Sequence, residues 1–163
     1  MKFLDASILG TLDECPRKCQ LRYVLHKVPR EEGLAKEFGS SAHAGRNEWY
    51  DGGDVEKAVE LVKKLWEPYE GKDPDGLYTV AKLEEVIRAY VNQFGSEPWK
   101  HSKGEQLLEF EMFGQLLVGL VDGTGEYLEE AAFQEFKTSK YPGMFCSRPN
   151  LQLTTYGVGL SAL

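Results

Sequence analysis

The sequence predicts a single α/β domain over residues 1–163. Its hydrophobic pattern changes once, from helical spacing to the alternation of strands, and no linker divides the chain into separate domains. In residues 1–103 apolar side chains recur at helical spacing, between turns that are rich in glycine and proline. After Gly104 apolar and polar side chains alternate, which is typical of strands that are buried on one face. There is no internal repeat, low-complexity segment or linker. Residues 104–163 are therefore expected to form a β-meander and a final helix.

Two short helices are expected near the N-terminus. Ser7 can cap a helix over residues 7–12, because its hydroxyl can accept a hydrogen bond from a free backbone N–H. Pro16 is favoured at a first helical position and opens a second helix over residues 16–27. The side chains expected to face inward from this second helix are Leu21, Val24 and Leu25.

Three longer helices follow, and each has a clear end signal. A helix over residues 34–50 is closed by Gly52-Gly53. Asp54 caps the next helix, which runs to Pro68 with an apolar stripe that is typical of a core. A third amphipathic helix ends at Gly95. The stripe of the middle helix consists of Val55, Val59, Val62, Leu65 and Trp66.

Three strands are expected to form an antiparallel meander after these helices. The first covers residues 108–113 and turns at Gly114-Gln115 into the second, over residues 116–122. A connection rich in glycine and glutamate leads to the third strand, over residues 131–137. The last element is expected to be a helix over residues 150–163, which begins at an asparagine cap.

Bulk properties exclude several classes of protein. No apolar run is long enough to span a membrane and no signal peptide precedes the first helix, so we expect a cytoplasmic protein with no membrane partner. The net charge of −7 argues against a protein that coats nucleic acid. Residues 15–30 and 137–163 nevertheless contain basic side chains and no acid. Cys15, Cys19 and Cys146 fit a reducing compartment better than a disulfide framework.

Two carboxylates and a lysine give the predicted meander its chemistry. Asp122 ends the second strand, and Glu135 and Lys137 are two residues apart on the third, so their side chains share a face while Phe136 points into the core. Neighbouring carboxylates repel each other unless a cation lies between them, and oxygen ligands suit Mg²⁺ or Mn²⁺. A metal ion and an ammonium group can stabilise a phosphodiester transition state. A Glu-x-Lys pair is also common on protein surfaces, which is the alternative.

Four motifs occur in an order that resembles a known family. They are G-x-x-x-H at Gly39–His43, G-x-x-D at Gly119–Asp122, E-x-K at Glu135–Lys137 and Q-x-x-x-Y at Gln152–Tyr156. The chain resembles the RecB-like branch of the PD-(D/E)xK nucleases, which includes exonuclease domains of recombination helicases, CRISPR-associated nucleases and phage proteins. The segment Cys15-Pro16-Arg17-Lys18 is also similar to that family, so the resemblance covers nearly the whole chain.

The resemblance implies a restriction-endonuclease-like core and a role for each motif residue. Lys137 would orient or activate water, and Gln152 and Tyr156 would brace the site or touch the DNA backbone. A lone histidine in such a context is otherwise a surface or core residue, and Tyr156 is otherwise an ordinary core aromatic. The groups that the resemblance assigns to Mg²⁺ or Mn²⁺ are the side chains of His43, Asp122 and Glu135 and the backbone carbonyl of Phe136.

The resemblance also raises two alternatives. Some of these nucleases bind an iron–sulfur cluster through four cysteines, and Cys15 stands where the first would be. We do not expect a cluster, because three cysteines are too few for four thiolate ligands. The family usually continues beyond its Q-x-x-x-Y helix into another strand and more helices, so a truncated form is the second alternative.

These observations predict a metal-dependent deoxyribonuclease that acts on DNA ends or single strands. The resemblance favours an exonuclease of recombination, repair, or phage or CRISPR processing. The alternative is a non-catalytic or truncated DNA-binding or assembly module that retains the nuclease fold. The sequence leaves open exonuclease against endonuclease, strand polarity, DNA against RNA, the oligomeric state and the protein partner.

Overall fold

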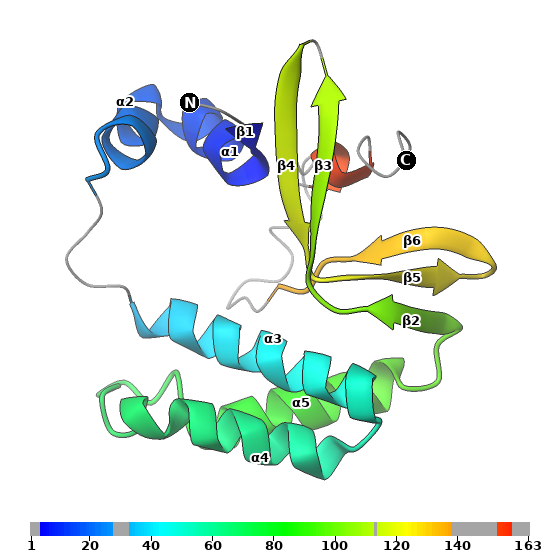
Figure 1. Ribbon diagram of the computed structural model, residues 1–163. Helices are drawn as coiled ribbons and strands as arrows, with labels where there is room; N and C mark the ends of the chain where they lie inside the picture. The colour runs from blue at the N-terminus through cyan, green and yellow to red at the C-terminus, as the bar shows by residue number, and fades with distance from the viewer. Residues whose placement is uncertain (1–3, 28–32, 113, 138–152, 158–163) are drawn as a thin grey trace.

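The computed structural model describes residues 4–27, 33–112, 114–137 and 153–157. Helices precede most of the strands, so the predicted α/β class is confirmed. Figure 1 shows a layer of long helices on one side and small sheets on the other, with short N-terminal helices beside the upper sheet. Among the described residues, no helix is long and apolar enough to cross a membrane.

The N-terminal segment begins with a strand and two short helices. Asp5 caps the first helix, because its Oδ1 accepts a hydrogen bond of 2.7 Å from the backbone N–H of Ile8. The predicted cap at Ser7 is therefore wrong by two residues, and Ser7 lies inside the helix. The elements are β1 (Leu4–Asp5), α1 (Ala6–Glu14), α2 (Pro16–Cys19) and a π-helical stretch, η1 (Gln20–Val24).

Pro16 begins α2 as predicted, but the inward face of the following turn was not predicted correctly. Val24 and Leu25 are 56% and 47% exposed, so they do not belong to a core. The hydrogen bond from Leu25 N–H to the carbonyl of Gln20 spans five residues. Such a wide turn changes which side chains share a face, and the expected helical spacing fails there.

The helical layer agrees closely with the predicted end signals. Gly53 ends α3 with φ of 68°, a left-handed conformation that glycine adopts without strain. Asp54 caps α4 by accepting hydrogen bonds from the N–H groups of Glu56 and Lys57. The elements are α3 (Leu34–Gly52), α4 (Val55–Trp66), a 3₁₀ turn η2 (Glu67–Tyr69) and α5 (Val80–Phe94).

These three helices enclose the larger of two apolar clusters that the described residues form. A Cβ atom at Gly45 would overlap the side chains of Val62 and Ile87, so the backbone of α3 lies directly against α4 and α5. Leu65 was expected in this core and is instead 39% exposed. The buried members are Phe38, Ala42, Ala58, Val59, Val62, Trp66, Leu83 and Ile87.

In the described residues the strands form two sheets rather than one meander. In the first, the β3–β4 hairpin is antiparallel as predicted, and β1 pairs in parallel with β4. In the second, the order is β2-β5-β6, with antiparallel pairing. The strands are β2 (Trp99–Lys103), β3 (Gln106–Met112), β4 (Gln115–Val121), β5 (Gly123–Tyr127) and β6 (Glu130–Gln134).

The third predicted strand therefore pairs with a different partner. Its observed counterpart, β6, lies beside β5, which was expected to be a connection because of its glycines. A Cβ at Gly125 would overlap the backbone carbonyl of Lys100, so glycine allows β5 to approach β2 closely. The meander is thus corrected to two hairpins, β3–β4 and β5–β6, that belong to different sheets.

This arrangement places the motif acids at the junction of the two sheets. Asp122 lies between β4 and β5, where the chain passes from one sheet to the other. Gly123 pairs with Gln134, so the residues just after β6 lie beside Asp122. Residues 153–157 are helical, in agreement with part of the expected final helix. The remainder of that predicted helix lies outside the described residues.

Candidate functional site

His43 and Asp122 join the helical layer to the sheet junction. His43 lies on α3, where the neighbouring Ala42 is buried in the helical cluster and holds this turn of the helix in place. The Nδ1 atom of His43 is 3.1 Å from Oδ1 of Asp122, and both side chains are mostly buried. Two of the predicted ligands are therefore in direct contact.

The second oxygen of Asp122 binds the segment after β6. Its Oδ2 accepts a hydrogen bond of 2.6 Å from the backbone N–H of Phe136. Burial alone would raise the pKa of Asp122, but the hydrogen bonds from His43 and Phe136 outweigh it and the pKa falls below its usual range. Asp122 is therefore held as a carboxylate at the contact between α3 and the two sheets.

Glu135 and Lys137 form an ion pair beside this carboxylate. Lys137 Nζ contacts Glu135 Oε1, and the glutamate side chain is 7% exposed whereas the lysine side chain is 40% exposed. Burial raises the pKa of Glu135, and the negative charge of Asp122 adds to this effect while Lys137 opposes it. Two carboxylates that disfavour each other's charge thus share one small region.

Phe136 lies between these two residues and points the other way. Its ring packs against the apolar cluster of the helical layer and meets the ring of His43 edge-on, with centroids 5.1 Å apart. The structure shows its N–H bound to Asp122, whereas the predicted metal ligand was its carbonyl oxygen. The alternation of Glu135, Phe136 and Lys137 places the charged groups on one side although β6 ends at Gln134.

Arg46 is a buried part of the site that the sequence analysis missed. It is 1% exposed, and its Nη2 donates hydrogen bonds to the backbone carbonyl of Asp122 at 2.5 Å and to Asn47 Oδ1 at 2.8 Å. Its guanidinium lies over the rings of Phe136 and Tyr50, 5.3 and 5.9 Å from their centroids. The available signal was its position three residues after His43, which places both on one helical face.

Tyr156 contacts β4 and braces it. Its hydroxyl donates a hydrogen bond of 2.8 Å to the backbone carbonyl of Leu120, and a Cβ atom at Gly119 would overlap its ring. The ring also meets Phe133 of β6 edge-on, 5.7 Å away between centroids. Gln152, the other residue of this predicted motif, lies outside the described residues.

The motif residues surround one cavity of about 570 Å³. One wall is α3 and the other consists of the ends of the strands and the segments that follow them. Helix α3 contributes the polar side chains Lys36, Ser40, His43 and Asn47. The facing wall contributes Glu105, Asp122, Glu135 and Lys137, and Tyr156 lies at its edge.

The donor set suits a hard divalent cation in its chemistry, because the carboxylates of Asp122 and Glu135 and the imidazole of His43 line the same cavity, with Glu105 as a further carboxylate. Within the described part of the chain, however, no three histidine, cysteine, aspartate or glutamate side chains converge as a ready-made metal site. Asp122 binds His43 and Phe136, while Glu135 binds Lys137. A bound cation would replace these contacts rather than enter an open cage.

Comparisons with known proteins give one match. A family model described as the PD-(D/E)XK nuclease superfamily matches residues 4–163. No curated protein and no solved structure matches the chain.

Proposed function

The chain belongs to the PD-(D/E)XK nuclease superfamily, and on this premise we propose that it hydrolyses phosphodiester bonds of DNA with a divalent metal ion. Members of the superfamily are generally nucleases that use such ions. The mixed α/β architecture, with helices against small mixed and antiparallel sheets, is consistent with a restriction-endonuclease-like fold.

The observation that carries the proposal is the convergence of distant motif residues on one cavity. His43 comes from α3, Asp122 from the β4–β5 junction and Glu135 from the end of β6, yet all three line the same space. The raised pKa of Glu135, which burial causes and Asp122 increases, indicates a place where a cation would be favourable. An ion pair between Glu135 and Lys137 that only stabilised the fold would not require His43 from a separate helix in the same cavity.

The proposed roles follow from these positions. His43, Asp122 and Glu135 would hold Mg²⁺ or Mn²⁺, which supplies positive charge and lowers the pKa of attacking water. Lys137, once released from Glu135, has the exposure to reach a phosphoryl oxygen and stabilise its negative charge. Tyr156 would keep β4, and with it Asp122, in position.

The finer parts of the proposal rest on the motif order. The four motifs support a RecB-like exonuclease that acts on ends or single strands in recombination, repair, or phage or CRISPR processing. The second candidate is a DNA-binding or assembly module without activity, and the mutual pairing of the donor atoms in the described residues favours it.

Digestion of end-labelled single- and double-stranded DNA with added Mn²⁺ separates these candidates. We expect cleavage by the wild type and a loss of about a hundredfold or more in Lys137→Ala, since a positioned charge typically contributes that much. Lys57→Ala is the matched control, because Lys57 lies on α4 in a groove away from the motif acids. Wild-type rates in Lys137→Ala would refute the lysine role. No cleavage by folded, Mn²⁺-bound wild type would favour the binding module.

A further inference from the structure

The two walls of the cavity that the motif residues surround differ in the chemical groups that they present. Within the lining of the cavity, α3 contributes Lys36, Ser40, His43 and Asn47 and no carboxylate. The opposite wall contributes the carboxylates of Glu105, Asp122 and Glu135. Apart from His43, the α3 wall therefore offers hydrogen-bond donors to an anion, whereas the opposite wall, apart from Lys137, offers carboxylate ligands to a cation.

The four polar side chains of α3 follow a single line along the helix. Their spacings of four, three and four residues place them on one face. From Lys36 to Asn47 this line extends about 16 Å along the helix axis, at about 1.5 Å per residue. A single small anion is too short to contact the whole line, whereas an extended chain of phosphates is long enough.

The orientation of Asn47 supports a role toward an anion. Its Oδ1 accepts the hydrogen bond from Arg46 Nη2, so its Nδ2 amide hydrogens remain as donors. No residue in the described segments accepts a hydrogen bond from this Nδ2. The Nδ2 atom is 3.9 Å from the place that a Cβ atom at Gly104 would take, at the edge of the cavity beside Glu105.

Small residues leave space along α3 between these polar side chains. Ala35, Gly39 and Ala44 line the same cavity between the polar side chains of α3. Lys36 and Ser40 are exposed to solvent. A polymer backbone can therefore approach the helix closely along its length, with His43 between the outer donors.

We propose that Lys36, Ser40 and Asn47 form a phosphate-binding track, in which α3 holds the sugar–phosphate backbone of a nucleic acid strand. Lys36 and Asn47 contact phosphates on opposite sides of the position of His43. The track deepens the proposed nuclease function, since it rests on that function for the statement that the bond to be cut lies between these contacts. The binding itself does not depend on catalysis.

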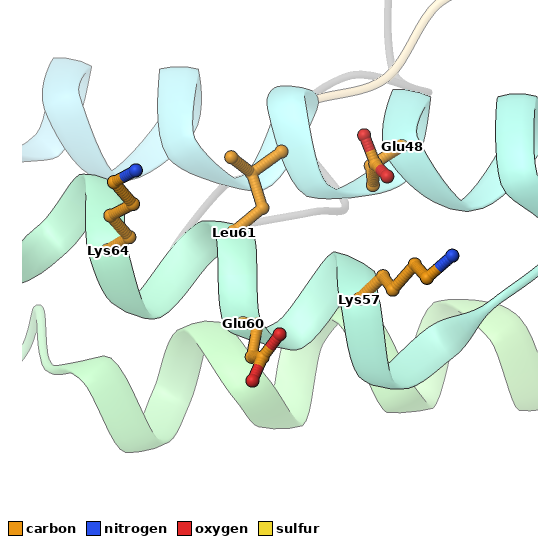
Figure 2. Close-up of a pocket in the computed structure, with 5 residues that line it drawn as sticks. All are labelled: Glu48, Lys57, Glu60, Leu61 and Lys64. Carbon is orange, nitrogen blue, oxygen red and sulfur yellow. The ribbon is translucent and has the colours of Figure 1, made fainter.

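A second polar groove on the same helical layer supplies a comparison. Figure 2 shows Lys57, Leu61 and Lys64 on α4 beside Glu48 on α3. In this groove Glu60 lies between the two lysines in the sequence. Leu61 points toward α3 between the same two lysines. This groove presents lysines but no row of uncharged hydrogen-bond donors. We therefore do not expect it to bind a nucleic acid strand along its length.

The test is the affinity for a short fluorescent oligothymidylate, measured by anisotropy in EDTA over a series of salt concentrations. Lys36→Ala should weaken binding by about fivefold at low salt. It should also reduce the slope of log K against log salt by about 0.7 to 1, as expected for one lost phosphate contact. Asn47→Asp keeps the acceptor for Arg46 but replaces the donor by an anionic oxygen, and should weaken binding further.

Matched controls separate a track from general electrostatics. Lys57→Ala removes the same charge from the groove of Figure 2, and Asn92→Asp adds the same charge at an exposed position of α5. Both should bind nearly as the wild type does, with melting temperatures checked for every variant. Equal losses in Lys36→Ala and Lys57→Ala, or unchanged binding in both cavity variants, would overturn the track. Track-dependent binding by a wild type that fails to cleave with Mn²⁺ would reject the nuclease proposal and leave the track standing.

Discussion

The helical layer and the sheet junction are stabilised in different ways. In the helical layer, apolar side chains such as Trp66, Leu83 and Ile87 are almost completely buried against one another. At the junction, the buried groups are Arg46, Asp122 and Glu135, which all carry or can carry charge. Buried apolar surface favours folding, whereas buried charge opposes it unless each group is well paired.

This contrast separates the helical layer, which stabilises the fold, from the sheet junction, which carries the candidate chemistry. Helix α3 belongs to both regions, with Ala42 in the apolar cluster and His43 in contact with Asp122. The apolar contacts of one face of α3 therefore hold the polar groups of the other face in position. Substitutions in the layer should change stability first, and substitutions at the junction should change metal binding and cleavage first.

Trp66→Ala should produce the largest effect on folding. Trp66 is 1% exposed and packs against Phe38 with ring centroids 5.6 Å apart. Loss of such a ring typically costs about 3 to 5 kcal/mol of unfolding free energy. Urea unfolding measures this loss, and Leu65→Ala on the exposed face of α4 is the control. A smaller loss in Trp66→Ala than in Leu65→Ala would contradict the assignment of the core.

Metal binding should produce the next largest effect, and it should act at the junction. At about a hundred times its Kd, Mn²⁺ should raise the unfolding free energy by about 2.7 kcal/mol through mass action. Mn²⁺ should bind more tightly than Mg²⁺, because imidazole is a softer ligand than carboxylate. Asp122→Ala should lose this stabilisation, whereas Glu109→Ala, at an exposed position of β3, should keep it. Equal calorimetric affinities for wild type and Asp122→Ala would reject the proposed site.

Arg46→Met should affect cleavage more than it affects folding. The substitution keeps an unbranched side chain but removes the hydrogen bond to the carbonyl of Asp122. Misplacement of the carboxylate should lower kcat by about tenfold to a hundredfold, with a smaller change in KM. Arg46→Lys should recover part of the loss, because it restores the charge but not the planar group.

The matched control is Arg88→Met, since Arg88 binds Glu56 and Glu84 on the outer side of the helical layer. It should leave kcat nearly unchanged. If both arginine variants lowered kcat equally, Arg46 would have no special relation to Asp122.

Glu135→Gln should give the smallest effect, visible in the pH dependence of the metal-free protein. Burial raises the pKa of Glu135 above its usual range, so the folded state holds this proton more tightly than the unfolded state. Stability should then fall as pH rises from about 4, the usual value for glutamate, through the raised folded pKa. Asp122 acts oppositely, because its pKa is lowered and its contribution disappears as pH falls through that value.

Urea unfolding in EDTA at several pH values measures both trends. Glu135→Gln should remove the fall in stability above about pH 4, and Glu109→Gln, at an exposed position of β3, is the matched control. A profile that is the same in Glu135→Gln as in the wild type would show that folding does not favour the protonated form of Glu135.

The helices could be predicted because their signals are local. Asp54 caps α4 and Gly53 ends α3 through contacts within a few residues, which sequence spacing can reveal. The two-sheet arrangement could not be predicted in this way. Strand β5 begins at Gly123 and contains Gly125, whose lack of a side chain removes the alternating pattern but permits the close approach to Lys100.

The candidate site shows the same division between local and distant contacts. The E-x-K spacing was sufficient to place Glu135 and Lys137 together. The bond from Arg46 to Asp122 joins residues far apart in the sequence, and only the folded chain shows it. The role proposed for Lys36 and Asn47 likewise depends on the wall that faces them across the cavity. Helical periodicity alone does not predict that wall.

The contact of Tyr156 with β4 also sets an order of events during synthesis. Its ring covers Gly119, and its hydroxyl binds the carbonyl of Leu120, which precedes it by 36 residues. The β3–β4 hairpin can pair soon after it leaves the ribosome, since its strands adjoin each other in the chain. The brace that holds Asp122 must wait until Tyr156 has been translated and has emerged. A nascent chain therefore carries the residues that are proposed to bind the metal before Tyr156 can brace β4 beside them.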